Sequence, residues 1–119
     1  MILVTSHIGS DFDSLASMVA ASKLYDGALL SFSGSAGRTV REFLKRFPGR
    51  WEVLTPRKIT LGDVELLVVV DARSRSRIGA FAPLLDRPGL KVHLYDHHPP
   101  AQDEIDAEKK VIEPVGAVT

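Results

Sequence analysis

Seven acidic and histidine side chains lie in three short segments, and carboxylate and imidazole are groups that bind divalent cations. They are His7, Asp11 and Asp13 in SHIGSDFDS, Asp71 in VVVDARS, and Asp96, His97 and His98 in LYDHHPP. Four carboxylates packed together repel one another, so a cluster of this kind is costly unless cations neutralise it. If the three segments meet in space, these residue types therefore predict a divalent metal site.

The ligand types also indicate which metals fit. A set of imidazole and carboxylate groups without sulfur favours Mn²⁺ or Mg²⁺ and also suits Zn²⁺, Co²⁺ or Fe²⁺. Cysteine is absent from the sequence, which excludes a thiolate site and a disulfide scaffold and fits a reducing cytosol. Because four carboxylates exceed what one ion needs, we predict two ions bridged by one aspartate. A water between them would become the hydroxide nucleophile for phosphoryl hydrolysis.

Each aspartate also has an ordinary structural role when it is considered alone. Asp13 directly precedes an expected helix and could be its N-cap. Asp11 could form an Asx turn in a loop. Asp71 follows a hydrophobic run and could be a turn former or a helix cap.

The histidines have ordinary alternatives too. His7 alone is more often a buried, hydrogen-bonded histidine than a ligand, and the pair His97 and His98 before two prolines fits a surface loop. We assign His93, inside an expected strand, to packing or hydrogen bonding. The metal prediction rests on the coincidence that all three segments follow expected strands.

The elements that must position these residues alternate between strand and helix. Apolar runs predict strands at 2–6, 28–32, 51–54, 66–70, 91–95 and 111–112. Apolar spacing predicts helices at 14–25 and 38–47, the second ending at Pro48 and Gly49, and a helix or helical turn at 75–85 interrupted near Pro83.

This alternation predicts an α/β fold: a mostly parallel sheet with helices on both faces, Rossmann-like and three-layered. In such sheets ligands bind beyond the carboxyl ends of the strands, where the strand order reverses. The three chemistry-bearing segments all follow strands at that end. The fold class thus provides the reason for them to meet.

Length and composition set the wider limits. The chain has 119 residues, fifteen basic and fifteen acidic, with a mean hydropathy of +0.05, as expected for one globular domain. Without net charge, any binding of nucleic acid must come from a local patch. The apolar stretches are too short for a membrane span and no secretory signal is present, so we expect no membrane partner and a cytoplasmic location. The ending KKVIEPVGAVT predicts that residues 1–119 are a C-terminally truncated piece of a longer protein.

The three segments also carry a family resemblance. HIGSDFDSLAS, VVVDARSRSRIG and YDHHPP resemble, in order, the first three motifs of the DHH phosphoesterase superfamily. That superfamily includes single-strand exonucleases, nano-RNA and cyclic-dinucleotide phosphodiesterases, and manganese-dependent pyrophosphatases. The runs DFDSLASMVAASKLY and FSGSAGRTVREFL are similar to the N-terminal domain of bacterial tRNA nucleotidyltransferase/poly(A) polymerase proteins, which also contain CBS and polymerase domains.

The resemblance implies a ligand set with two Mn²⁺ ions, although Mg²⁺, Co²⁺ or Zn²⁺ could replace them. His7 and Asp11 would bind one ion and Asp13 the other, Asp71 would bridge the two, and His97 would complete the second ion's ligands.

It also implies roles around the metals. Asp96 would orient a ligand by hydrogen bonding, and His98 would face the substrate phosphate, so Asp71 and His98 are the catalytic candidates. We consider Arg73, Arg75 and Arg77 candidate phosphate-binding residues because they closely follow Asp71. The family's fourth motif, with a further metal-binding aspartate, and its C-terminal substrate-binding domain fall outside this sequence.

Three functions remain open from the sequence. The first is a two-metal phosphoesterase acting on a phosphate ester, a nucleotide or RNA, with tRNA among the candidate substrates. The second is a non-catalytic nucleotide- or RNA-binding module of a tRNA-adenylating enzyme, working with C-terminal domains of the same chain. The third is a manganese-dependent inorganic pyrophosphatase, which would need basic phosphate-binding residues from a second domain.

Overall fold

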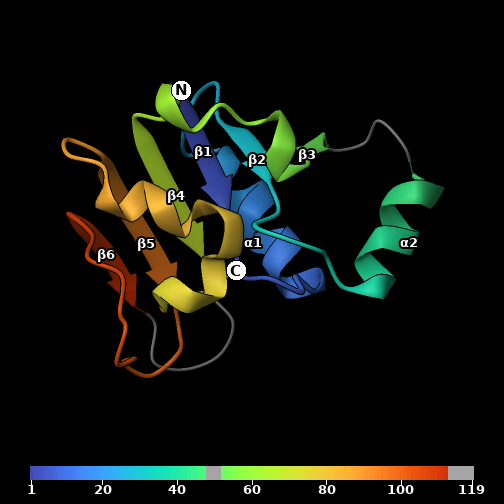
Figure 1. Cartoon of the computed structure of the whole chain (residues 1–119). Helices are drawn as coiled ribbons and strands as arrows, with labels where there is room; N and C mark the ends of the chain where they lie inside the picture. Colours follow the sequence, from blue (N-terminus) through green and yellow to red (C-terminus); the bar gives the residue numbers. More distant parts are fainter. Residues whose placement is uncertain (48–51, 113–119) are drawn as a thin grey trace.

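The computed structural model describes residues 1–47 and 52–112, and Figure 1 shows its elements. The strands are β1 (Ile2–Thr5), β2 (Leu29–Ser31), β3 (Val53–Leu54), β4 (Leu66–Val70), β5 (Lys91–Asp96) and β6 (Lys109–Ile112). The α-helices are α1 (Phe12–Ser22) and α2 (Arg38–Arg46), and the 3₁₀ segments are η1 (Pro56–Lys58), η2 (Leu61–Asp63) and η3 (Arg75–Asp86). The helix stop predicted at Pro48 and Gly49 lies outside the described residues.

The sheet is parallel throughout, as the sequence predicted. Its strand order is β3-β2-β1-β4-β5-β6. The chain starts in the middle of the sheet, winds to one edge, and then returns to build the other half from β4. The order therefore reverses between β1 and β4, which pair in register from Ile2 with Leu66 to Thr5 with Val69. This reversal places the ends of β1 and β4 side by side.

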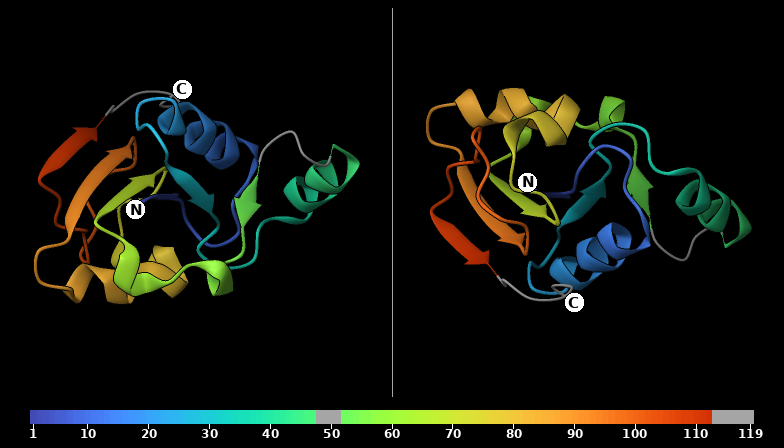
Figure 2. Two further views of the ribbon diagram at one scale, coloured as in Figure 1. Left: turned by 90° about the horizontal axis from the view of Figure 1, so that it is seen from above. Right: turned by 90° about the horizontal axis from the view of Figure 1, so that it is seen from below.

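Helical segments cover both faces of the sheet, which confirms the three-layer prediction (Figure 2). On one face Val68 and Val70 of β4 pack in a cluster with Met18 of α1. On the other face Leu67 and Val69 pack in a cluster with Phe81 of η3. β4 is thus buried on both sides, which explains its continuous apolar run.

The start of α1 differs from the prediction. The helix begins at Phe12, and Asp11, with an extended backbone, is its N-cap: its carboxylate accepts a hydrogen bond from the Ser14 N–H at 2.9 Å. Asp13 lies in the first turn instead of capping it. The helix ends at Ser22, earlier than expected, because Lys23 caps it and Gly27 turns the chain towards β2 with a positive φ of 76°.

The histidine inside β5 has the structural role that the sequence predicted. His93 forms hydrogen bonds, as expected: its Nδ1 lies 2.7 Å from the Tyr25 hydroxyl and its Nε2 lies 3.1 Å from Glu108 Oε1.

Within residues 1–47 and 52–112, none of the helices combines the length and apolar character that crossing a bilayer requires.

A kink inside η3 ties together the loops that follow β1 and β2. The Ile8 N–H donates to the Arg77 carbonyl at 2.8 Å, and the Ala80 N–H donates to the Ser33 carbonyl at 2.9 Å. Between them Gly79 has a φ of 43°, and a Cβ there would lie 2.6 Å from the Ser33 carbonyl oxygen. Only glycine fits this close approach.

Replacing Gly79 by alanine should therefore destabilise the domain more than the same change at Gly89. Gly89 also has a positive φ, of 80°, but a Cβ there would meet nothing within 4 Å. Gly89→Ala should cost only the left-handed backbone penalty of about 1–2 kcal/mol. Gly79→Ala must also displace a backbone carbonyl and should cost at least about 1 kcal/mol more. Urea unfolding of both variants measures this difference, and equal losses would contradict the close packing of these loops.

Candidate metal centre

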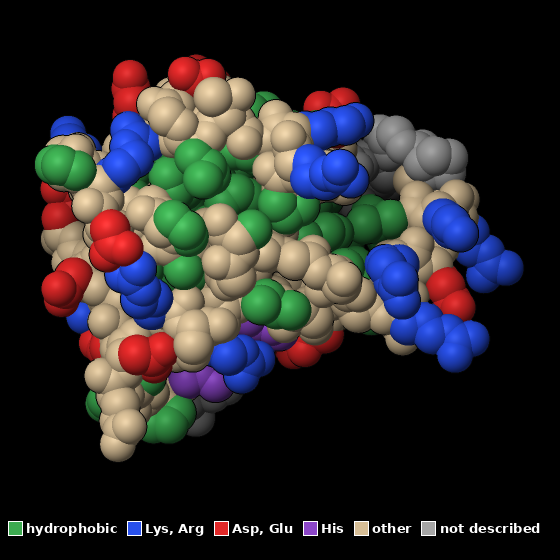
Figure 3. All heavy atoms as spheres, in the orientation of Figure 1, with side chains coloured by type: hydrophobic (Ala, Val, Ile, Leu, Met, Phe, Trp, Pro, Cys, Tyr) green, Lys and Arg blue, Asp and Glu red, His purple; other side chains and the backbone are tan. Residues whose placement is uncertain are grey.

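The carboxyl ends of β1, β4 and β5 bring the three predicted segments together. Potential ligand atoms lie within 4.8 Å of one another in two groups, one of His7, Asp11 and Asp71 and the other of Asp71, Asp96, His97 and His98. Nitrogen or oxygen ligands on opposite sides of one ion lie about 4–5 Å apart, so each group is compact enough to hold an ion. Histidine side chains reach the surface along the lower edge of Figure 3, beyond the strand ends seen in Figure 1. Asp71 belongs to both groups.

The backbone of Asp71 has an unusual conformation. Its φ is 56°, the one positive value among the non-glycine residues that the structure describes, and its side chain is buried. The Asp71 N–H donates to the Tyr95 carbonyl at 2.9 Å, which continues the pairing of β4 with β5 beyond the strand. Aspartate tolerates this left-handed region better than most residues, and a buried residue held there points to a functional constraint.

The two carboxylate oxygens of Asp71 face different partners. Oδ2 accepts a hydrogen bond from the Ser14 hydroxyl at 2.8 Å and lies 3.4 Å from His7 Nε2, whereas Oδ1 lies 3.0 Å from His97 Nε2. Burial alone would raise the pKa of Asp71, but hydrogen bonds from His7, Ser14 and His97 outweigh it and lower the pKa to about 2. Asp71 is thus a charged group shared between two sets of ligands.

His7 is oriented by the backbone beside it. Its Nδ1 lies 2.8 Å from the Ile8 carbonyl oxygen, which can only accept, so Nδ1 carries a hydrogen. Its Nε2 then faces Ser14 Oγ at 2.8 Å and Asp71. The hydrogen bond to Asp71 raises the pKa of His7. A cation that binds Nε2 would therefore replace a proton there.

Ser14 is the residue at this site that sequence reasoning missed. Its buried hydroxyl lies 2.9 Å from Asp11 Oδ1 and 2.8 Å from both His7 Nε2 and Asp71 Oδ2. The single hydroxyl hydrogen cannot be donated to both carboxylates at once. One carboxylate oxygen therefore lacks a donor from Ser14 and can accept a further proton or bind a cation. The signal in the sequence was the spacing from Asp11 to Ser14, which places the third helical residue over the cap.

Asp96 and His98 form a second pair, in which the carboxylate is buried and the imidazole is half exposed. Asp96 is 0% exposed, and its carboxylate accepts from the His98 N–H at 3.1 Å and pairs with His98 Nδ1 at 2.6 Å. Asp96 therefore orients His98, the residue expected to face the substrate, instead of the expected ligand His97, and it leaves His98 Nε2 on the opposite side of the ring. The His97 ring lies 4.3 Å from the His98 ring.

Asp13 is placed differently from the other predicted ligands. The structure brings six of the seven residues together, whereas Asp13 is exposed in the first turn of α1 and belongs to neither group. The physical reason is that Asp11 takes the cap position, so Asp13 becomes a helical residue facing outwards. Its role as a ligand of the second ion stays a prediction.

The three arginines after Asp71 have different surroundings. Arg73 is largely buried. Its Nε donates to the Glu104 carboxylate at 2.7 Å, and its Nη1 donates to the His98 carbonyl at 2.7 Å. Arg75 pairs with Asp86 at 2.8 Å. Arg77 is exposed, has no side-chain hydrogen bond or ion pair within the described part of the chain, and lies close enough to His7 for its charge to lower that residue's pKa. Arg77 is therefore the arginine best placed to meet an anion.

The donor set fits a pair of divalent cations. The converging atoms are imidazole nitrogens and carboxylate oxygens without sulfur, one charged carboxylate is common to both groups, and a carbonyl or carboxylate fixes the rings of His7 and His98.

The chain is similar to known proteins over nearly its whole length. The chain is 42% identical to an A-adding tRNA nucleotidyltransferase from Geobacter sulfurreducens over 120 aligned positions, which cover all of this chain and 14% of that protein. Its fold is similar to the crystal structure of an exopolyphosphatase-related protein from Bacteroides fragilis, with a TM-score of 0.72 and 17% identity over 98% of this chain and 36% of the other. The model of the DHH family, N-terminal domain, matches residues 1–117. The chain therefore belongs to the DHH family, and it corresponds to the family's N-terminal domain.

Proposed function

We propose that this domain hydrolyses phosphate esters with the help of two divalent cations, and that Mn²⁺ is the preferred ion. The observation that carries the proposal is the position of Asp71, whose two oxygens face His7 on one side and His97 on the other. A carboxylate placed in this way is suited to bridge two ions. Bound there, the ions would polarise the phosphate and lower the pKa of a water molecule between them.

The protein's own residues have distinct tasks in this proposal. His7 and Asp11 would hold one ion with Asp71, and His97 would hold the other with Asp71. Asp13 is assigned to the second ion by the family resemblance alone. Ser14 keeps the first group in place from the helix terminus.

His98 is suited to proton transfer. Because Asp96 binds its Nδ1, the free Nε2 can donate a proton to a substrate oxygen or accept one from it.

Arg77 would bind the substrate phosphate. It is unpaired in the described part of the chain and lies beside the His7 group, and a guanidinium can hold two phosphate oxygens at once. Arg73, which the sequence suggested equally, instead supports the loop of His98 from within.

We further propose that the domain works inside a larger, cytoplasmic tRNA nucleotidyltransferase/poly(A) polymerase-type protein, with a nucleotide or RNA substrate, including tRNA. The chain spans about one seventh of the relative that it matches. Further domains of the same chain would supply another aspartate and close over the site. The 42% identity to a protein named for adding A to tRNA also favours a second candidate, a nucleotide- or RNA-binding module without hydrolytic activity.

Mn²⁺ should raise the melting temperature, because a ligand that binds only the folded state stabilises it. At a hundred times the dissociation constant the gain is about 2.7 kcal/mol. Asp71→Asn should abolish most of this rise, since asparagine tolerates the same left-handed backbone but carries no charge. Asp106→Asn is the matched control, because Asp106 is exposed and outside both ligand groups. A melting temperature indifferent to millimolar Mn²⁺ would contradict the site.

Hydrolysis tests the proposed function directly. With Mn²⁺, the chain alone should cleave bis(p-nitrophenyl) phosphate weakly, and a longer chain that includes the following domains should cleave it much faster. The reason is that two-metal hydrolysis needs both ions fixed and the phosphate held against them. Asp71→Asn should abolish turnover in both proteins. If the 119-residue chain equals the longer one, the further domains are dispensable and the account of them is wrong.

The arginines provide a control within the same assay. Arg77→Lys should raise KM and leave the Mn²⁺ dependence of the melting temperature unchanged, because lysine cannot replace the two-pronged contact. Arg75→Lys should leave KM as it is, since that residue is already paired with Asp86.

A further inference from the structure

The α2 helix carries a local concentration of positive charge. The whole chain has fifteen basic and fifteen acidic residues, yet the nine residues of α2 hold four basic side chains against Glu42: Arg38, Arg41, Lys45 and Arg46. Basic side chains gather at the right-hand end of the molecule in Figure 3, where α2 lies in Figure 1. A neutral domain can attract a polyanion only through such a patch.

Aromatic rings lie beside this charge. Phe12 of α1 and Phe47 at the end of α2 are each 45% exposed. Phe43 stands between them, with ring centres 5.4 Å from Phe12 and 5.0 Å from Phe47. Two exposed phenylalanine rings joined by a half-buried one, next to basic residues, are the kind of surface on which nucleic-acid bases stack.

Two shallow hollows follow this row of rings. One, of about 320 Å³, lies between α1 and α2 and is lined by Phe12 and Phe43 together with Lys23. The other, of about 430 Å³, shares Phe12 and Phe43 and adds Phe47, Arg46 and the carboxylate of Glu42. Each hollow thus combines aromatic rings with a cation, which is what alternating bases and phosphates require.

The surface begins at the metal centre. Phe12 directly follows Asp11, a ligand candidate, and the Gly37 N–H before α2 donates to the Ser10 carbonyl at 2.8 Å. A nucleic-acid strand that lay in the two hollows would therefore lead towards the predicted ions.

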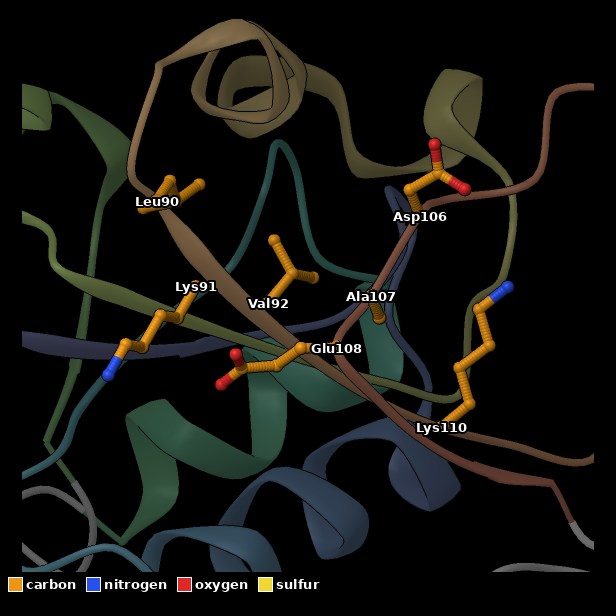
Figure 4. Close-up of a pocket in the computed structure, with 7 residues that line it drawn as sticks. All are labelled: Leu90, Lys91, Val92, Asp106, Ala107, Glu108 and Lys110. Carbon is orange, nitrogen blue, oxygen red and sulfur yellow. The ribbon is translucent and has the colours of Figure 1, made fainter.

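The hollow at the opposite edge of the sheet offers no such combination (Figure 4). It is lined by Lys91 and Lys110, which extend in opposite directions, and by the carboxylates of Asp106 and Glu108. No aromatic side chain lines it. Because no ring accompanies its charged groups, Lys91 is a suitable control position.

We propose that the surface formed by Lys23, Arg46, Phe12, Phe43 and Phe47 binds single-stranded nucleic acid, with bases on the rings and phosphates on the basic side chains. The proposal rests on the proposed function and deepens it, because it names the polymer that reaches the metal centre. Binding measured without metal separates the two, since it needs no hydrolysis.

The test is fluorescence anisotropy in EDTA with a labelled oligoadenylate of about 12 nucleotides, as RNA and as DNA, and with a duplex of the same length. Phe12→Leu and Phe47→Leu keep apolar bulk but remove the ring, and each should weaken single-strand binding roughly 5- to 100-fold. Arg46→Gln should lower the slope of log affinity against log salt by about 0.7. Lys91→Gln should change neither quantity. The RNA and DNA affinities show which polymer is preferred.

Other outcomes would overturn the proposal. Unchanged single-strand binding in both leucine variants, or equal affinity for the duplex, would exclude base stacking at these rings. Sedimentation as a dimer that Phe12→Leu converts to a monomer would assign the surface to a second copy of the chain.

Discussion

The site depends on keeping one buried carboxylate charged. Burial opposes ionisation of Asp71, and hydrogen bonds from His7, Ser14 and His97 overcome it and hold the pKa near 2. Those partners come from the loop after β1, the start of α1 and the loop after β5. From the sequence alone, a divalent cation was the simplest way to offset repulsion within the acidic cluster. The structure shows that two histidines and a hydroxyl already offset part of it.

The topology explains why these partners can meet. The strand order reverses between β1 and β4, so residues more than sixty positions apart leave the sheet side by side. The left-handed backbone at Asp71 turns the chain there, and Gly79 lets η3 approach the loops after β1 and β2 closely. The same η3 covers one face of the sheet with Phe81. Core packing and ligand placement are therefore parts of one arrangement.

Local patterns were enough to predict most of the fold. The run at 66–70 is β4 to the residue, because a strand buried on both faces needs a continuous apolar segment. Alternation of strands and helices predicted the parallel sheet and hence the meeting of the three segments. The start of α1 was predicted two residues too late, since Asp13 is as good a cap by residue type as Asp11, which caps the helix through the Ser14 N–H. The segment at 75–85 became 3₁₀ turns because Gly79 and Pro83 interrupt an α-helix.

Contacts between distant residues could not be predicted from one sequence. Ser14 reaches Asp71 across 57 positions, and no local pattern shows this. The three arginines look equivalent in the sequence and differ only because Glu104 and Asp86 fold beside two of them. The aromatic surface also needs α1 and α2 to pack together.

The most direct measurement of the central claim is an anomalous difference map from a crystal soaked in Mn²⁺ and measured at the manganese edge. The account predicts two peaks that share the Asp71 carboxylate, one also contacting His7 and the other His97. Manganese bound elsewhere, with both Asp71 oxygens still paired only with Ser14 and the histidines, would contradict it.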